Sequence, residues 1–369
     1  MNKVKHISLS ITERCNLKCV YCFETSKLCK TMPFDTAIRV IDYELEHSGE
    51  YSSVAVDFMG GEPFLEFDLI RQICEHYWSQ QMHGKIKFMT TTNGTLVHGP
   101  IKQWLETHRD DFVCALSLDG DAAAHNMNRC NSFARIDVDF FRRMWPQQKV
   151  KAIVSNESLC LLSDSVKYLH QCGFPRIEIK LAYGLDWNRI EQSEMFVAEL
   201  EKLVEYYTDN PELEPCSFLG LKIEKVLQPI SVITKWCNAG GRTISYNMDG
   251  VKFPCRYYQD LLRNGNMTLE EIWAVDYSQI HQTLEAPCKH CILHNLCRTC
   301  YAFNYEQNGS FGKKNNMSCA VTRDMAYMTA RLTLKRMEKA GGQKTEQQLR
   351  LLEACRQIEA AYTSGKWYA

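Results

Sequence analysis

The sequence of 369 residues predicts an α/β fold of six β/α repeats, followed by a small cysteine-rich region and C-terminal helices. Two observations support this prediction. Apolar runs of strand length alternate with segments of helical periodicity through the first two thirds of the chain, which is typical of parallel βαβ units. The chain also contains 18 cysteines, and most of those beyond residue 230 stand at the spacings of metal ligands.

The predicted strands are short apolar runs, several of them with alternating polarity. They are Val4–Thr12, Ser53–Met59, Lys85–Thr91, Phe112–Leu118, Lys149–Val154 and Ile177–Leu181. Helical patterns separate them, for example Asp35–His47, Asp68–Gln81 and Glu157–Cys172. Six repeats are fewer than the eight of a closed barrel, and functional groups in such folds project from loops at the carboxyl ends of the strands.

Composition places the chain among globular proteins. It is 45% hydrophobic with a net charge of -1, so no charge excess favours nucleic acid. No run approaches the roughly 18 apolar residues of a membrane span, and no signal peptide is recognisable. Cysteines grouped at ligand spacings in a long chain without a signal favour a reduced protein over a disulfide framework. We therefore expect a cytoplasmic protein of roughly two to three domains, with no nucleic-acid or membrane partner.

The first cysteine group is Cys15, Cys19 and Cys22, at C-x3-C-x2-C spacing directly after the first strand. Three thiolates on one loop can hold three irons of a 4Fe–4S cube and leave the fourth iron open to a small chelating molecule. A zinc knuckle is the alternative, but structural zinc takes four closed ligands, and the nearest further candidate is Cys29. The spacing therefore favours an iron–sulfur cluster.

The triplet, with Tyr21 before its third cysteine, resembles that of the radical SAM enzymes. The resemblance implies a partial (β/α)6 TIM barrel, with a cluster whose open iron is chelated by S-adenosylmethionine (SAM) and with Tyr21 beside this cofactor. One electron then cleaves SAM to a 5′-deoxyadenosyl radical. The protein's part is to orient the cofactor, tune the cluster and exclude water.

Gly60, Gly61 and Glu62 follow the second strand. Two glycines let the backbone approach a ligand closely, and a carboxylate beside them can accept hydrogen bonds from an ammonium. Alone, such a sequence is usually a plain turn. At this strand end it resembles the GGE motif of the superfamily, which implies that the three residues hold the amino group of SAM.

Polar residues also follow the third and fourth strands. Asn93 lies in Thr91–Thr95, and Ser117, Asp119 and Arg129 lie in a Ser-Leu-Asp-Gly-x4-His-x3-Arg run. Asn-Gly and Asp-Gly turns explain each stretch taken alone. The longer run resembles one found in peptide-modifying radical SAM enzymes, which implies that Ser117 and Asp119 lie beside the ribose. Arg129 would pair with the cofactor carboxylate, for which its planar fork is suited.

Seven further cysteines form a second set. They are Cys237, Cys255, Cys288, Cys291, Cys297, Cys300 and Cys319. A zinc ribbon is the alternative, but its CxxC pairs stand roughly 15–20 residues apart and it needs four ligands. The pattern resembles the SPASM extension of radical SAM peptide maturases, which implies two auxiliary 4Fe–4S clusters and three clusters in all. By this resemblance the far cluster is held by Cys288, Cys291, Cys297 and Cys319, and the near cluster by Cys237, Cys255 and Cys300.

The predicted organisation has four parts. A radical SAM partial barrel covers 1–190, a helical linker 191–235, a SPASM domain with a β-hairpin 236–320, and a helical extension 321–369. In the extension, helical patterns at 322–339 and 345–362 predict an antiparallel pair packed on the SPASM domain.

Three functions are compatible with these motifs. One is maturation of a ribosomally synthesised peptide by a thioether or carbon–carbon crosslink. Another is anaerobic sulfatase maturation to formylglycine, although that subfamily typically has an Asp base where this chain has Arg256. The third is a non-catalytic iron–sulfur or zinc-binding protein. No residue is assigned as catalytic. The resemblance implies a peptide or protein substrate, a separate leader-binding protein or leader binding on the chain's own surfaces, and a reductant such as flavodoxin or ferredoxin.

Overall fold

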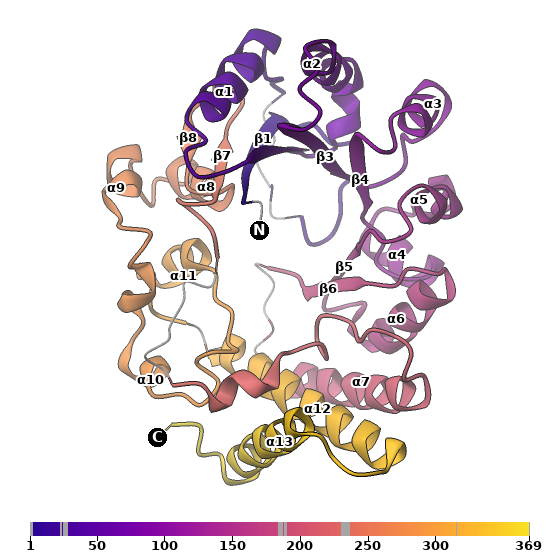
Figure 1. The fold of residues 1–369 in the computed structure, drawn as a ribbon, viewed down its shortest axis with the longest axis vertical. Coiled ribbons are helices and arrows are strands. Elements are labelled where there is room, and N and C mark those ends of the chain that lie inside the picture. The colour runs from indigo at the N-terminus through magenta and orange to yellow at the C-terminus, as the bar shows by residue number, and fades with distance from the viewer. Residues whose placement is uncertain are drawn as a thin grey trace.

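The structure is a computed structural model that describes residues 3–22, 24, 29–183, 187, 190–229, 237–314 and 316–368. Its central feature is a wall of six parallel strands with helices on its outer side (Figure 1). The strands are β1 (Val4–Thr12), β2 (Ser53–Gly60), β3 (Ile86–Thr92), β4 (Phe112–Leu116), β5 (Val150–Val154) and β6 (Ile177–Leu181). The α/β class and the six-stranded partial barrel are thus confirmed.

The strands follow one another around the wall in chain order. Strands β1 to β4 are adjacent in one sheet and β5 pairs with β6, while a parallel bridge between Ser117 and Lys151 joins β4 to β5. Alternate residues such as Ile7, Leu9 and Ile11 are fully buried against the helices. Each such side chain contributes about 1.5–3 kcal/mol on burial, which fixes the register of the strand. The residues between them face the interior of the barrel.

Among the described residues, seven helices lie outside the wall. They are α1 (Phe34–Glu46), α2 (Phe67–Ser79), α3 (Gly99–Thr107), α4 (Ala122–Asn128), α5 (Val138–Met144), α6 (Leu162–Gln171) and α7 (Ile190–Asp209), with 3-10 turns at η1 (Pro63–Glu66), η2 (Phe133–Arg135) and η3 (Leu159–Leu161). Helix α7, expected in a linker, buries Leu200, Leu203 and Tyr207 in the same core as the strands. It therefore acts as an outer helix of the barrel. Residues 230–235, the end of that expected linker, and residue 236, the first of the expected SPASM domain, lie outside the described residues.

The hairpin expected in the cysteine-rich region extends the barrel sheet. Strand β7 (Thr243–Tyr246) pairs in parallel with β1, and β8 (Lys252–Phe253) pairs with β7 in antiparallel orientation. The fully buried carboxylate of Glu44 on α1 forms ion pairs with Lys5 of β1 and, at 2.7 Å, with Lys252 of β8. A buried carboxylate needs such partners, so Glu44 ties the hairpin to the barrel.

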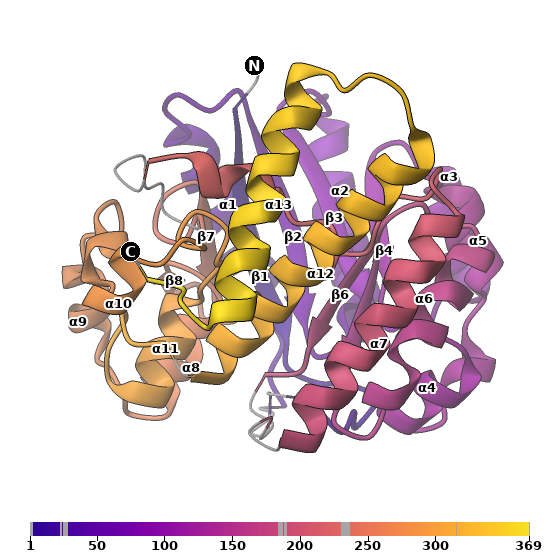
Figure 2. The ribbon, with the colours of Figure 1, turned by 90° about the horizontal axis from the view of Figure 1, so that it is seen from below.

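Short elements follow the hairpin. They are α8 (Tyr257–Arg263), α9 (Leu269–Ala274), η6 (Ile280–Thr283), α10 (Ala286–Lys289) and α11 (Tyr301–Asn308), and η4 (Ile223–Leu227) precedes it. The chain ends with α12 (Asn316–Ala340) and α13 (Glu346–Ser364). These two helices lie side by side at the bottom of Figure 1 and cross the front of the molecule in Figure 2, which shows it from below.

The helix pair packs on more than the SPASM region. Arg331 of α12 forms a 2.6 Å ion pair with Glu201 of α7, so the two C-terminal helices also contact the barrel. Leu293 and Leu296 of the cysteine-rich region share a buried cluster with Ile358 of α13. The pair therefore bridges the barrel and the cysteine-rich region. In the described part of the chain, no helix combines the length and apolar character needed to cross a membrane.

Candidate active site

A cavity opens at the carboxyl ends of β1 to β4, and the first three cysteines line it. The loop after β1 is folded by backbone bonds from Cys22 N to the Cys19 carbonyl (3.1 Å) and from Val20 N to the Asn128 carbonyl (3.0 Å). Burial raises the pKa of the Cys19 thiol to about 11, partly offset by Arg129. A thiol in such a place becomes a thiolate when a metal supplies the positive charge, so the donor set fits an iron site.

The two glycines of Gly60-Gly61-Glu62 hold this cysteine loop against the end of β2. A Cβ at Gly60 would lie 1.9 Å from the Thr12 carbonyl oxygen, and one at Gly61 would lie 2.4 Å from that of Arg14. Gly61 N donates to Thr12 O at 3.1 Å, and Glu62 N donates to Arg14 O at 2.9 Å. The sequence suggested close approach to a ligand; the structure shows close approach to the backbone leading to Cys15.

Glu62 is a buried carboxylate that lines the cavity. Its oxygens accept hydrogen bonds from Phe64 N (3.1 Å), Thr92 Oγ1 (2.7 Å) and Asn93 N (2.8 Å). Burial raises its pKa, although the three donors oppose the shift. Among the described residues it has no ion-pair partner within 4.0 Å. A buried anion that has no ion-pair partner in contact, and only the charge of Arg129 nearby, fits the ammonium group of SAM.

Asp119 is the centre of a hydrogen-bond network at the ends of β4 and β5. It accepts from Tyr21 OH at 2.7 Å, from Arg129 Nε and Nη2 at 2.9 and 3.0 Å, from Asn128 Nδ2 at 3.2 Å and from Ile153 N at 3.0 Å. The pair of Asp119 and Arg129 therefore fixes Tyr21, one residue before Cys22. The sequence did not predict this positioning role, and the contacts of Asp119 and Arg129 with the cofactor remain a proposal.

Asn93 and Ser117 both line the cavity but differ in freedom. The Asn93 amide is held by Asn16 Oδ1 at 2.9 Å and accepts from Thr95 N at 3.0 Å. The Ser117 hydroxyl has no hydrogen-bond partner among the described residues. Ser117 therefore has a polar group free for a ligand, whereas Asn93 shapes the wall.

Sequence reasoning missed the charged groups inside the barrel. Lys151 lines the cavity and donates to Thr91 Oγ1 at 2.8 Å. Burial raises the pKa of Asp57 on β2 to about 6, and the ammonium of Lys151 opposes the shift. Both residues stand at inward positions of their strands. The alternation of side chains along a strand was therefore the sequence signal that could have identified them.

Cys237, Cys255 and Cys300 come together although they span 64 positions. Burial and the two neighbouring thiols raise the pKa of Cys255 to about 12, while the amides of Tyr257 and Tyr258 favour its thiolate. Cys300 precedes α11 and is influenced in the same way by the first amides of that helix. Thiols that face one another and backbone amides suit a shared iron–sulfur group.

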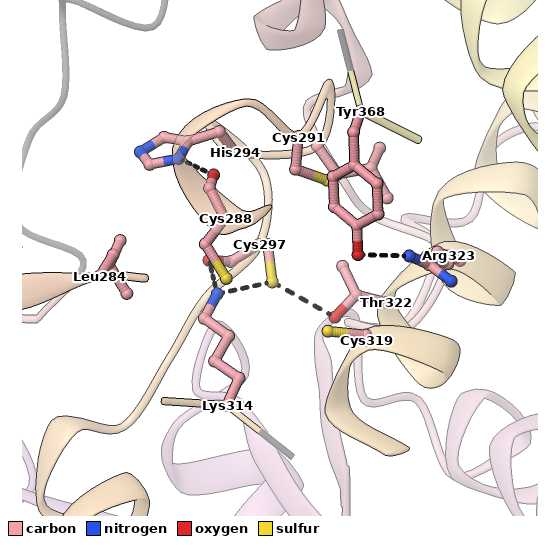
Figure 3. A pocket seen from close by; sticks show the side chains of 11 residues that line it. Leu284, Cys288, Cys291, His294, Cys297, Lys314, Cys319, Thr322, Arg323 and Tyr368 are labelled. Carbon is pink, nitrogen blue, oxygen red and sulfur yellow. Dashed lines mark hydrogen bonds between the residues drawn. The ribbon is translucent and has the colours of Figure 1, made fainter. Parts of the chain in front are cut away.

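The remaining four cysteines surround a second pocket (Figure 3). They are Cys288, Cys291, Cys297 and Cys319. Cys319 stands in the first turn of α12, which closes the pocket on one side. The seven later cysteines thus lie in two places, and their assignment as ligands of two clusters stays a prediction. In the part of the chain described, no three His, Cys, Asp or Glu side chains are placed so that together they could hold one metal ion.

Comparison with known proteins agrees with this architecture. Residues 9–142 match the sequence model of the Radical SAM superfamily. An uncharacterised protein of Methanocaldococcus jannaschii is 29% identical over 184 residues, 48% of this chain and 63% of that protein. A cysteine-type anaerobic sulfatase-maturating enzyme of Clostridium perfringens is 24% identical over 324 residues, 77% of this chain and 85% of that enzyme. The radical SAM cyclopropyl synthase TigE of Paramaledivibacter caminithermalis is 21% identical, covering 69% of this chain and 58% of TigE.

Solved structures show the same fold. Native anSMEcpe with bound AdoMet superposes with a TM-score of 0.69 at 18% identity, covering 96% of this chain and 100% of that one. Streptococcus suis SuiB bound to precursor peptide SuiA superposes with a TM-score of 0.59 at 17% identity, covering 86% of this chain and 76% of that one. Residues 9–142 of the chain therefore carry a radical SAM domain, whose superfamily uses SAM and a 4Fe–4S cluster, and the chain is an enzyme. With its cysteine-rich region it fits the SPASM type, and the non-catalytic hypothesis is set aside.

Proposed function

We propose that this enzyme modifies a ribosomally synthesised peptide, using three 4Fe–4S clusters. A 5′-deoxyadenosyl radical takes a hydrogen atom from a peptide residue, and a thioether or carbon–carbon crosslink forms as one proton and one electron leave. Cys15, Cys19 and Cys22 would hold the SAM cluster, and Gly60, Gly61 and Glu62 the amino group of SAM. The seven later cysteines would hold the near and far auxiliary clusters.

One observation supports this proposal above the others: Arg256 of the cysteine-rich region lines the same cavity as the first three cysteines and Glu62. Arg256 directly follows Cys255. A substrate in this cavity would therefore lie between the SAM site and the near auxiliary site. That arrangement suits a reaction in which a hydrogen atom leaves on one side and an electron on the other.

The same residue separates the two maturase hypotheses. Sulfatase-maturating enzymes typically have an Asp base directly after the cysteine that matches Cys255. Here a guanidinium occupies that position, and it is paired with Glu24 and Asp260. A guanidinium is always protonated and cannot accept a proton. Sulfatase maturation remains the alternative because the Clostridium perfringens relative matches over 77% of this chain.

Related structures support a peptide as the substrate. The anSMEcpe protein has been solved with bound AdoMet and the Cp18Cys peptide, and SuiB with SuiA. We infer that a peptide enters the cavity of this enzyme as well. A separate protein, or the barrel and SPASM surfaces, would bind a leader segment, and flavodoxin or ferredoxin would supply electrons.

Iron content tests the cluster assignment. The full chain is reconstituted without oxygen, and iron, sulfide and SAM cleavage are measured with and without Cys15, Cys19 and Cys22. About twelve irons should fall to about eight when the three are replaced by alanine, with cleavage abolished. Zinc in place of iron, or about four irons with cleavage intact, would contradict the assignment.

The bond formed is tested by mass spectrometry. The probes are peptides encoded beside the gene and a cysteine peptide with a sulfatase motif. A crosslink removes hydrogen and keeps sulfur, whereas formylglycine exchanges the sulfur of cysteine for oxygen. Loss of hydrogen alone would support the proposal, and an aldehyde trapped by hydrazide would favour the alternative.

A further inference from the structure

Lys314 lies in the pocket formed by the four far cysteines (Figure 3). Its ammonium donates a hydrogen bond to Cys297 Sγ at 2.9 Å and approaches the Cys297 carbonyl at 3.5 Å. Its positive charge also lowers the pKa of Cys288 and Cys319, against the larger effect of burial. One cation therefore faces three of the four thiols.

Arg323 brings a second positive charge to the same pocket. It stands one helical turn after Cys319, and its charge opposes the burial effect on the pKa of Cys291 and Cys319. Its Nη2 donates to Tyr368 OH at 3.0 Å, and its guanidinium lies 5.3 Å from the ring of Trp367. The C-terminal residues therefore hold Arg323 in place at the rim.

The near cysteines have different surroundings. The largest electrostatic influences on the pKa of Cys255 and Cys300, besides burial, come from other cysteines and backbone amides. One charged group also influences the pKa of Cys300, the carboxylate of Glu306, which raises it. Cations are thus among the main influences on the pKa values of Cys288, Cys291 and Cys319 but not of Cys255 and Cys300, although Arg256, paired with Glu24 and Asp260, directly follows Cys255.

We propose that Lys314, supported by Arg323, makes the far cluster the more readily reduced of the two auxiliary clusters. This inference rests on the proposed cluster set. Reduction adds one negative charge, which a nearby ammonium and an N–H···S hydrogen bond stabilise, and these are known determinants of cluster potential. With the clusters bound, this order of potentials would let the far cluster accept one electron from the reduced near cluster, while Lys314 keeps its protons. Electrons from the substrate would thereby move away from the cavity.

An EPR-monitored redox titration of the reconstituted full chain tests this role. The background carries alanine at Cys15, Cys19 and Cys22, and the signal lost in Cys288→Ala is assigned to the far cluster. In Lys314→Met, the equilibrium constant for reduction should fall about tenfold, equivalent to about 59 mV for one electron. Lys314→Arg should retain most of the wild-type potential.

The neighbouring Lys313 provides a matched control because it is exposed and one residue away. Lys313→Met should leave both midpoint potentials unchanged. Arg323→Gln gives a second measurement if Lys314→Met lowers iron content. Two results would overturn this inference and leave the proposed function standing. One is an unchanged midpoint potential of the far cluster in both variants with all clusters bound. The other is a wild-type far cluster that is harder to reduce than the near cluster. Absence of auxiliary iron would overturn the proposed cluster set as well.

Discussion

Arg256 forms a buried ion pair with Glu24, and the two side chains are only 8% and 7% exposed. Arg256 directly follows Cys255, and Glu24 lies two residues after Cys22. The pair therefore connects the segment that carries Cys255 to the loop that carries Cys22. Arg263 of α8 forms a second such connection, to Glu13. Two ion pairs, Arg256–Glu24 and Arg263–Glu13, thus join the region around Cys255 to the segment around the first three cysteines.

Replacing Arg256 with Asp tests both the ion pair with Glu24 and the alternative function, sulfatase maturation. The change leaves Glu24 beside a second carboxylate and should cost about 3–5 kcal/mol of the free energy of unfolding, as for other broken buried pairs. We expect no aldehyde in a cysteine peptide with a sulfatase motif. Denaturant unfolding and hydrazide trapping measure the two outcomes.

Neutralising both partners is the control for this change. Arg256→Met combined with Glu24→Gln removes both charges and should recover most of the lost stability. Appearance of formylglycine in Arg256→Asp would show that a carboxylate at this position suffices for sulfatase-type chemistry. That result would favour the alternative function.

The second prediction concerns Gly61. In Gly61→Ala the new Cβ would meet the carbonyl oxygens of Arg14 at 2.4 Å and Glu13 at 2.6 Å, so the loop bearing Cys15 must move. Overpacking of this kind costs about 1–3 kcal/mol. We expect loss of about four irons and of SAM cleavage. Iron analysis and a cleavage assay measure this.

Gly84→Ala is the matched substitution, because no atom lies within 4 Å of a Cβ at that position. It should leave iron content and cleavage unchanged. Full iron content in Gly61→Ala would show that the contact with the cysteine loop is dispensable.

The strands could be predicted because one face of each is buried. Val4–Thr12 and Ile177–Leu181 were predicted with the bounds that the structure gives. The fourth strand was predicted to continue to Leu118, but β4 ends at Leu116, where Ser117 turns to bridge Lys151. Periodicity shows which residues are buried, but it does not show where a strand leaves one neighbour for another.

Long-range relationships could not be read from local patterns. The parallel pairing of β7 with β1 joins Ile244 to Ile7, and nothing in either segment specifies the other. Spacing alone does not show whether Cys300 belongs with Cys297, three positions before it, or with Cys255. The fold decides, because it brings Cys300 close to Cys255 from a separate loop. The networks around Asp119 likewise depend on three loops meeting at one end of the barrel.

The third prediction concerns Glu62. Glu62→Gln removes the charge that we propose pairs with the SAM ammonium. A charge-assisted hydrogen bond contributes about 1.5–3 kcal/mol, so SAM affinity should fall about 10- to 100-fold. Equilibrium dialysis of the reconstituted protein measures the affinity, and exposed Glu75→Gln serves as the control. Unchanged SAM affinity would remove Glu62 from the cofactor site.

The last prediction concerns His125, which supports the backbone of the Asp119 loop. The side chain is fully buried; Asp119 N donates to Nδ1 at 3.4 Å, and Nε2 lies 2.9 Å from Ser132 Oγ. Burial, with the nearby Arg129, lowers its pKa from 6.5 to about 4. A lowered pKa means that the unfolded chain binds the proton first. The stabilisation is therefore present above pH 6.5 and is lost as the pH falls from 6.5 to about 4.

The size of this loss follows from the shift, at about 1.4 kcal/mol per unit, and amounts to about 3 kcal/mol. Denaturant unfolding of the wild type at several pH values across this interval should show the decline, and His125→Gln should have a shallower profile over the same interval. His47→Gln, at an exposed position directly after α1 and away from the Asp119 loop, is the matched control. Equal slopes for wild type and His125→Gln would mean that His125 does not titrate with unfolding, and that other groups set the acid sensitivity of the Asp119 loop.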